Sequence, residues 1–105
     1  MNDVYARPEP SRAEVDELPG PTMVEFGSAN CGICYAAQPN IAEATEGLDQ
    51  LHHIKIEDGR GLPLGRSFCV KLWPTLVFLR DGREVARLVR PDNAAVIKKA
   101  LQKIL

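Results

Sequence analysis

The chain lacks most of the features that mark secreted, membrane-bound or nucleic-acid-binding proteins. Among its 105 residues are only three cysteines, an odd number that is too small for a disulfide-stapled scaffold. No apolar run approaches the length of a membrane span, and the stretch Met1–Pro8 has no apolar core of a secretory signal. The formal net charge is −1, with both signs mixed along the chain. We therefore expect a protein of the reducing cytoplasm that binds neither nucleic acid nor membrane.

What the chain does contain is enough apolar sequence for one folded domain. Hydrophobic residues make up 45% of it, and its length leaves no room for a second domain. Residues 1–10 are polar and include Pro8 and Pro10, so we expect an extended or loosely packed lead-in there. The domain itself is expected over residues 11–105.

Local patterns predict helices alternating with strands. A capping box at Ser11 and Glu14 begins the first helix, and Asp81-Gly82 marks a hairpin turn. Pro39 lies inside the second helix and is expected to kink it. The predicted helices are Ser11–Leu18, Cys31–Glu46, a short one within Leu62–Val70, and a last one with Asp92 as N-cap and an apolar face of Ile97, Ala100, Leu101 and Ile104. The predicted strands are Thr22–Phe26, His52–Glu57, Thr75–Arg80 and Glu84–Val89.

The most informative stretch is Cys31-Gly32-Ile33-Cys34, which follows an apolar strand and opens a helix. Two cysteines spaced i, i+3 at a helix start lie close enough to form a disulfide. Backbone N–H groups and the helix dipole favour a thiolate at that place. Further along the chain, Trp73-Pro74-Thr75 leads into another apolar strand. A strand, a dithiol, a helix and a proline at the head of a later strand together form the layout of a redox site.

These features resemble the thioredoxin family over about Ser11 to Leu105. Besides the dithiol, the resemblance rests on Pro39, five residues after the second cysteine, on Trp-Pro-Thr at residues 73–75, and on Asp-Gly-Arg-Glu-Val at residues 81–85. It implies an α/β fold, a three-layer α/β/α sandwich around a central mixed sheet of four to five strands. It also implies a cis peptide bond before Pro74, beside the dithiol, which leaves the preceding backbone free to pair with an extended substrate segment.

The chain departs from the usual family pattern at several positions near the dithiol. Where the family commonly has Trp-Cys-Gly-Pro-Cys, Asn30 and Ile33 replace the tryptophan and the proline. Glu25 stands in place of a buried aspartate, and Arg90 in place of a glycine after the last strand. Trp73 stands where the residue before the cis-proline is usually small or aliphatic. We expect the dithiol chemistry to survive these changes, and the reduction potential and the choice of substrate to differ.

The predicted catalytic residues are Cys31, Cys34, Glu25 and Pro74. Cys31 is the nucleophile, whose thiolate attacks a partner disulfide and forms a mixed disulfide. Cys34, one turn further on and more buried, is the resolving thiol; the alternative is a fixed disulfide or two inert core cysteines. By family analogy, Glu25 relays a proton to or from Cys34 through water. Its alternative is a side chain that reaches solvent or a nearby lysine, and the alternative for Pro74 is an ordinary trans proline.

A substrate-binding surface is expected around these residues. Gly32 allows a tight turn and close approach of the substrate. Trp73 is either an exposed anchor or a core residue. Arg90 either borders the groove and favours acidic partners or is simply solvated. The predicted substrate-binding residues are Asn30, Gly32, Ile33, Trp73, Thr75 and Arg90.

Three further side chains have chemistry of their own. Cys69, between Phe68 and Val70, is expected to be a small buried hydrophobe, with a regulatory or dimer-forming disulfide as the minor alternative. His52 and His53 adjoin a strand start and are expected to face opposite sides. A half-exposed strand histidine is favoured over one that lies near Glu25.

Three functions are compatible with these residues. The leading one is a thiol–disulfide oxidoreductase that reduces protein disulfides as a monomer. It is expected to need no bound cofactor and to depend on a separate reductase for its electrons. Its cellular role would be electron transport and redox homeostasis. The second is a binding or assembly-factor module in which the dithiol is secondary. The third is a zinc site with Cys31, Cys34 and either Cys69 or a histidine. Structural zinc requires four ligands, and the second pair is missing, so we expect no metal.

Overall fold

The computed structural model describes residues 4–105 and has a four-stranded mixed sheet at its centre. Along the chain its elements are α1 (Arg12–Asp16), β1 (Pro21–Gly27), α2 (Gly32–Thr45), β2 (His52–Glu57), α3 (Pro63–Ser67), β3 (Thr75–Arg80), β4 (Arg83–Val89) and α4 (Ala94–Gln102). The strand order is β2-β1-β3-β4, with β1 parallel to β2 and antiparallel to β3. The predicted α/β class and mixed sheet are confirmed.

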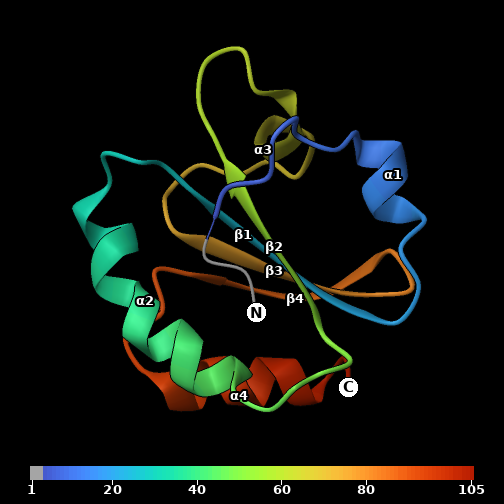
Figure 1. Ribbon diagram of the computed structural model, residues 1–105, viewed down its shortest axis with the longest axis vertical. Helices are drawn as coiled ribbons and strands as arrows, with labels where there is room; N and C mark the ends of the chain where they lie inside the picture. The colour runs from blue at the N-terminus through green and yellow to red at the C-terminus, as the bar shows by residue number, and fades with distance from the viewer. Residues whose placement is uncertain (1–3) are drawn as a thin grey trace.

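The two central strands alternate their side chains between two apolar cores, as strand geometry requires. Met23, Leu76 and Phe78 pack with the apolar faces of α2 and α4. Val24, Phe26, Val77 and Leu79 pack with residues of α1 and α3. Figure 1 shows α2 and α4 on one side of the sheet and α1 and α3 on the other. Burial on both faces explains why the central strands read as continuous apolar runs.

Most of the predicted elements lie where the sequence places them. β2 and β3 have the predicted bounds, and the capping box at Ser11 and Glu14 is present. Asp81 and Gly82 have φ angles of 51° and 80°, as a tight two-residue hairpin turn requires. Pro39 lies within α2, and the kink expected there stays a prediction.

The predicted N-cap of the last helix is wrong by one residue. Asn93 caps α4, since its side-chain oxygen accepts a hydrogen bond from the backbone N–H of Val96 at 2.9 Å. Asp92 instead accepts a hydrogen bond from the Asn93 side-chain amide at 2.9 Å. Asp and Asn are equally good caps, so adjacent residues of these types leave the helix start ambiguous in the sequence.

The segment before α1 is extended and packs against the sheet edge. Tyr5 forms a parallel bridge with Lys55, and the backbone N–H of Ala6 donates to the Lys55 carbonyl at 2.8 Å. Arg7 pairs with Glu57 at 2.7 Å. The Glu9 carboxylate accepts a hydrogen bond from the backbone N–H of Leu64 at the start of α3, at 2.8 Å. The division between a lead-in over residues 1–10 and a domain over residues 11–105 stays a prediction, and residues 1–3 lie outside the described range.

None of the helices found in residues 4–105 is both long enough and apolar enough to cross a bilayer.

Candidate active site

The two cysteines of the dithiol lie where β1 ends and α2 begins. Cys31 is the N-cap of α2, and Cys34 lies in its first turn. Their sulfur atoms are at disulfide-bonding distance, with Cα atoms 5.2 Å apart. Cys34 is only 4% exposed, whereas Cys31 is partly exposed. The more accessible sulfur is therefore the one predicted to be the nucleophile.

The start of α2 provides an electrostatic setting that favours negative charge on Cys31. The backbone N–H of Cys34 donates to the Cys31 sulfur at 3.0 Å. No acidic residue occupies the first turn of α2. The unpaired N–H groups and the positive end of the helix dipole stabilise an anion at this position. In the reduced protein the Cys31 sulfur is thus held in surroundings that favour its thiolate form.

The segment before β3 lies against the dithiol. The Trp73–Pro74 peptide bond is cis, and the Trp73 carbonyl oxygen lies 3.9 Å from the Cys31 sulfur. The half-buried Trp73 side chain donates from its indole nitrogen to an Asp58 carboxylate oxygen at 2.8 Å. Thr75 is 1% exposed and its hydroxyl donates to the Leu72 carbonyl, so this side chain supports the loop from below the surface and does not line it.

Arg90 borders the same loop from the end of β4. Its guanidinium Nε donates to the Trp73 carbonyl at 2.8 Å, and its backbone N–H donates to the Pro74 carbonyl at 2.9 Å. Its φ angle of 52° lies in the left-handed region that favours glycine, the residue usual here in the resembled family. The Arg90 side chain is exposed and also hydrogen-bonded to the loop that contacts Cys31, so it borders the groove, and its preference for acidic partners stays a prediction.

Glu25 is a buried carboxylate with a partner for each oxygen. It is 1% exposed, so of the alternative interpretation, solvent or a nearby lysine, the solvent half is wrong and the lysine half agrees with the structure, where Lys55 is nearby. One oxygen lies 2.9 Å from Nε2 of His53. The other accepts a hydrogen bond from the Gln38 amide at 2.8 Å and lies 4.0 Å from the Lys55 ammonium. Gln38 also donates to the Cys34 carbonyl at 2.9 Å, which links the carboxylate to the dithiol.

His53 lies beside Glu25, so the favoured prediction of a half-exposed histidine is wrong for it. Its side chain is 2% exposed, whereas its neighbour His52 is exposed. His53 and Lys55 are two residues apart on β2 and therefore share a face. Glu25 is paired with Lys55 in the register of β1 and β2, which brings His53 to the same buried side.

Tyr5 completes the surroundings of Cys34, although the sequence pattern did not single it out. A Cβ built at Gly27 would lie 3.0 Å from the Cys34 sulfur and 3.1 Å from the Tyr5 hydroxyl, so both groups approach the same point. Burial and the negative charges of Glu25 and Glu57 raise the pKa of Tyr5. Tyr5 and Lys55 line, with both cysteines and Gln38, a hollow of about 740 Å³ next to the dithiol.

The exposed rim of the site includes residues that the sequence predicted and one that it missed. Asn30, Gly32 and Ile33 are exposed beside Cys31, with Ile33 46% exposed. Tyr35, which follows Cys34 directly, is 83% exposed and lines the hollow. The sequence could have indicated Tyr35 as a site residue, because it lies in the helical turn directly after the dithiol.

Cys69 is exposed, and the prediction of a buried hydrophobe is wrong. Phe68 fills the core position after α3. Cys69 follows with a φ angle of 58°, and the chain turns it outward.

Among the residues that the structure describes, no group of three or more His, Cys, Asp and Glu side chains is arranged to hold a metal ion.

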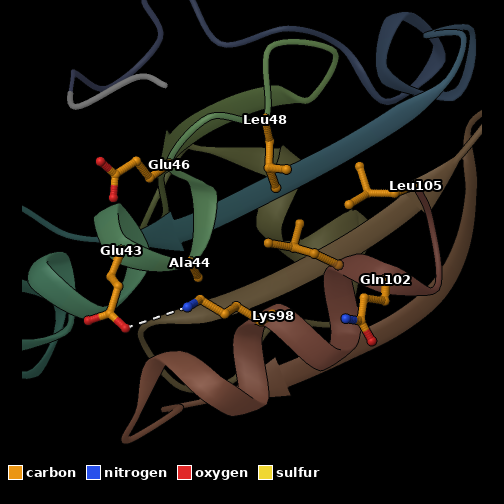
Figure 2. A pocket seen from close by; sticks show the side chains of 8 residues that line it. Glu43, Ala44, Glu46, Leu48, Lys98, Gln102 and Leu105 are labelled. Carbon is orange, nitrogen blue, oxygen red and sulfur yellow. Dashed lines mark ion pairs between the residues drawn. The ribbon is translucent and has the colours of Figure 1, made fainter.

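A second hollow, of about 400 Å³, lies at the other end of α2, against α4. Figure 2 shows Glu43 of α2 and Lys98 of α4 facing one another across it, with 3.6 Å between the charged atoms. None of the predicted site residues lines this hollow.

Comparison with known proteins identifies similar chains. A family model described as Thioredoxin matches residues 6–103. Thioredoxin of Mycobacterium tuberculosis H37Rv is 30% identical over 81% of this chain and 74% of that protein. Thioredoxin-2 of Pyricularia oryzae is 28% identical over 64% of this chain, and the match spans 39% of that longer protein. The solved structure of thioredoxin 2 from Pseudomonas aeruginosa PAO1 in its reduced form is 56% identical, with a TM-score of 0.84 and coverage of 97% of this chain and 94% of that one.

Proposed function

The chain belongs to the thioredoxin family, and we propose that it reduces disulfide bonds of other proteins. Thiol–disulfide exchange is the chemistry of its Cys31–Cys34 pair. The observation that carries the proposal is the asymmetry of this pair: two sulfurs at bonding distance, one partly exposed at a helix N-terminus and one buried.

The reaction proceeds in two exchanges. The Cys31 thiolate attacks one sulfur of the partner disulfide, and the other partner sulfur leaves as a thiolate. Cys34 then loses its proton and attacks the Cys31 sulfur, which releases the second partner thiolate and leaves a Cys31–Cys34 disulfide. Two electrons have passed to the partner. A separate reductase returns them to the pair.

Glu25 is the proton acceptor for Cys34 in this scheme. Its carboxylate is buried, is hydrogen-bonded through Gln38 to the Cys34 backbone, and lies on the same side of β1 as the helix that carries the dithiol. The hollow beside the two cysteines is also lined by Gln38 and Lys55, the two side chains next to one Glu25 oxygen, so water in it lies close to both the sulfurs and the partners of the acid. General acid–base transfer of this kind requires such reach, directly or through one water.

The substrate docks on the rim around Cys31. Its exposed apolar side chains, Ile33, Tyr35 and Leu72, suit a polypeptide substrate. The Trp73 carbonyl is a backbone acceptor 3.9 Å from the nucleophilic sulfur, and Arg90 already donates to it. A substrate strand that pairs there shares or displaces that contact and meets an exposed guanidinium. Partners with an acidic side chain next to their disulfide are therefore preferred.

We place this activity in a monomer in the cytoplasm. An exposed, unpaired Cys69 is compatible with a reducing compartment, where such a thiol persists. Size-exclusion chromatography with and without reductant tests the monomer, and a dimer in reductant would contradict it.

Cysteine variants test the proposed function. Cys31→Ser is expected to abolish reduction of insulin disulfides with dithiothreitol as electron donor, because no nucleophile remains. Cys34→Ser is expected to accumulate a mixed disulfide that is visible on a non-reducing gel. Cys69→Ser is the matched control and keeps wild-type activity. Full activity of Cys31→Ser would refute the proposal, and full cellular function of a Cys31→Ser/Cys34→Ser double variant would favour a binding module.

Arg90 has its own test with peptide disulfides that carry either Asp or Lys beside the cysteine. Arg90→Gln is expected to lower the rate with the Asp peptide about fivefold, as for loss of one exposed charge contact, and to leave the Lys peptide unchanged or faster. Arg83→Gln, at the opposite end of β4, serves as the control. Equal effects on both peptides would contradict the charge preference.

A further inference from the structure

His53 holds a buried position in the site that the two exchanges above do not use. Its Nε2 lies 2.9 Å from one Glu25 oxygen, and the two side chains are 2% and 1% exposed. Burying a titratable side chain is costly unless its polar atoms are paired. The Glu25–His53 contact joins two such groups, one on β1 and one on β2, on the sheet face that α2 covers.

The two oxygens of Glu25 thereby have separate surroundings. The oxygen beside Gln38 and Lys55 is the one connected to the dithiol, because Gln38 also donates to the Cys34 carbonyl. The oxygen beside His53 points to the other side of the carboxylate. His53 therefore holds the oxygen that is not linked through Gln38 to Cys34, and so fixes the orientation of the carboxylate.

Charged and titratable groups from neighbouring elements also lie near the pair. Lys55 of β2 lies 3.3 Å from the Gln38 side-chain oxygen, and Tyr5 of the N-terminal segment has its pKa raised in part by the Glu25 charge. The Cys34 sulfur of α2 and the Tyr5 hydroxyl both approach Gly27 at the end of β1. Leu76, the residue paired with Glu25 on β3, carries no charge.

We infer that His53 is a positioning residue for the release step, acting through Glu25; this inference rests on the proposed function. With its Nε2 proton donated to Glu25, His53 holds the carboxylate in one orientation. As Cys34 attacks the Cys31 sulfur, its thiol proton passes, directly or through water, to the Glu25 oxygen beside Gln38. The electron pair left on the Cys34 sulfur forms the new S–S bond, and the partner leaves as a thiolate.

Loss of His53 has a defined consequence for this step. Without the His53 donor, one buried Glu25 oxygen loses its hydrogen bond, and the carboxylate is no longer held in the orientation that meets Gln38. A misplaced proton acceptor slows the proton transfer that accompanies attack by Cys34, so the release step is expected to slow about tenfold.

The test uses the reduced protein and an aromatic disulfide reagent that liberates a coloured thiolate at each exchange. The first phase reports attack by Cys31, and the second reports attack by Cys34. His53→Leu is expected to slow the second phase about tenfold and to leave the first phase unchanged. His53→Gln, whose amide still donates to Glu25, is expected to restore the wild-type rate of the second phase. His52→Leu, an exposed neighbour on the same strand, is the matched control.

The outcomes separate the inference from the proposed function. A wild-type protein without a second phase, or with a first phase that survives Cys31→Ser, would refute the proposed function itself. A wild-type second-phase rate in a folded His53→Leu variant would overturn only the role of His53. If His53→Leu fails to fold, His53→Asn carries the same expectation, because its shorter amide ends short of the Glu25 oxygen. An equal slowing of both phases would indicate a merely structural role and would also overturn the inference.

Discussion

At the residue scale, the positions of Trp73 and Asp58 depend on the absence of a side chain at Gly65. The Asp58 carboxylate accepts the Trp73 indole N–H at 2.8 Å and lies directly against Gly65 of α3. A Cβ at Gly65 would overlap an Asp58 oxygen. The packing of the short helix α3 therefore affects the position of Trp73, whose carbonyl contacts Cys31.

Gly65→Ala is expected to displace Asp58 and break its hydrogen bond to Trp73. The loss of about 1 kcal/mol from that hydrogen bond is offset by a similar gain from replacing a helical glycine by alanine, so the free energy of unfolding changes little. Since Trp73 is the single tryptophan of the chain, its fluorescence emission reports the change directly. Asp58→Ala should give the same altered spectrum, and the double variant should add nothing to it. An unchanged spectrum would contradict the proposed coupling.

Residue-scale predictions from the sequence succeeded where neighbours along the chain decide the outcome. The spacing of Cys31 and Cys34 at a helix start is a local property, and their sulfurs lie at bonding distance. The burial of Cys69 was predicted wrongly because its flanking residues are apolar while its backbone is left-handed. Nothing in the residue types at that point indicates the change of direction.

At the scale of elements, helix starts are determined by side chains that pair with free backbone N–H groups. Ser11 and Glu14 do so reciprocally for α1, and Asn93 does so for α4. The α4 cap is the more consequential one, because this helix supplies four buried residues to the core beneath the sheet.

Asn93→Ala is expected to lower the free energy of unfolding by about 1 kcal/mol, the usual cost of a lost N-cap. Asn93→Asp retains an acceptor oxygen and should remain close to wild type. Asp92→Ala, one residue earlier, should cost less than Asn93→Ala, because Asp92 makes no contact with the Val96 backbone N–H that Asn93 caps. Urea unfolding of the three variants measures these differences. A larger effect at Asp92 would mean that α4 begins one residue earlier in solution.

At the scale of the whole molecule, the N-terminal segment joins the sheet edge, α3 and the active site. Tyr5 reaches the surroundings of Cys34, Ala6 pairs with β2, and Glu9 caps the start of α3. The segment therefore closes one side of the hollow next to the dithiol.

Removal of the first nine residues is expected to lower the free energy of unfolding by roughly 2 to 3 kcal/mol, since two buried or half-buried hydrogen bonds and apolar contacts of Ala6 are lost together. Arg7→Ala, which breaks only an exposed ion pair, should change it by less than about 0.5 kcal/mol. Urea unfolding compares the two. A deletion variant as stable as wild type would show that the segment contributes no net stability to the fold.

The sequence by itself determined the order of the elements, the two-sided burial of the central strands, the hairpin turn at Asp81-Gly82 and the dithiol at a helix start. Each depends on periodicity, on capping or on backbone preferences within a few residues. Such interactions are encoded locally, and tertiary packing here reinforced them.

The tertiary structure alone decided which distant side chains meet. Glu25 and His53 come together because β1 and β2 are paired in one register, and Arg90 reaches the Trp73 carbonyl because β4 ends beside the start of β3. Tyr5 approaches Cys34 because its segment bridges to Lys55. These contacts depend on strand register and on the path of loops, which residue types at single positions do not specify.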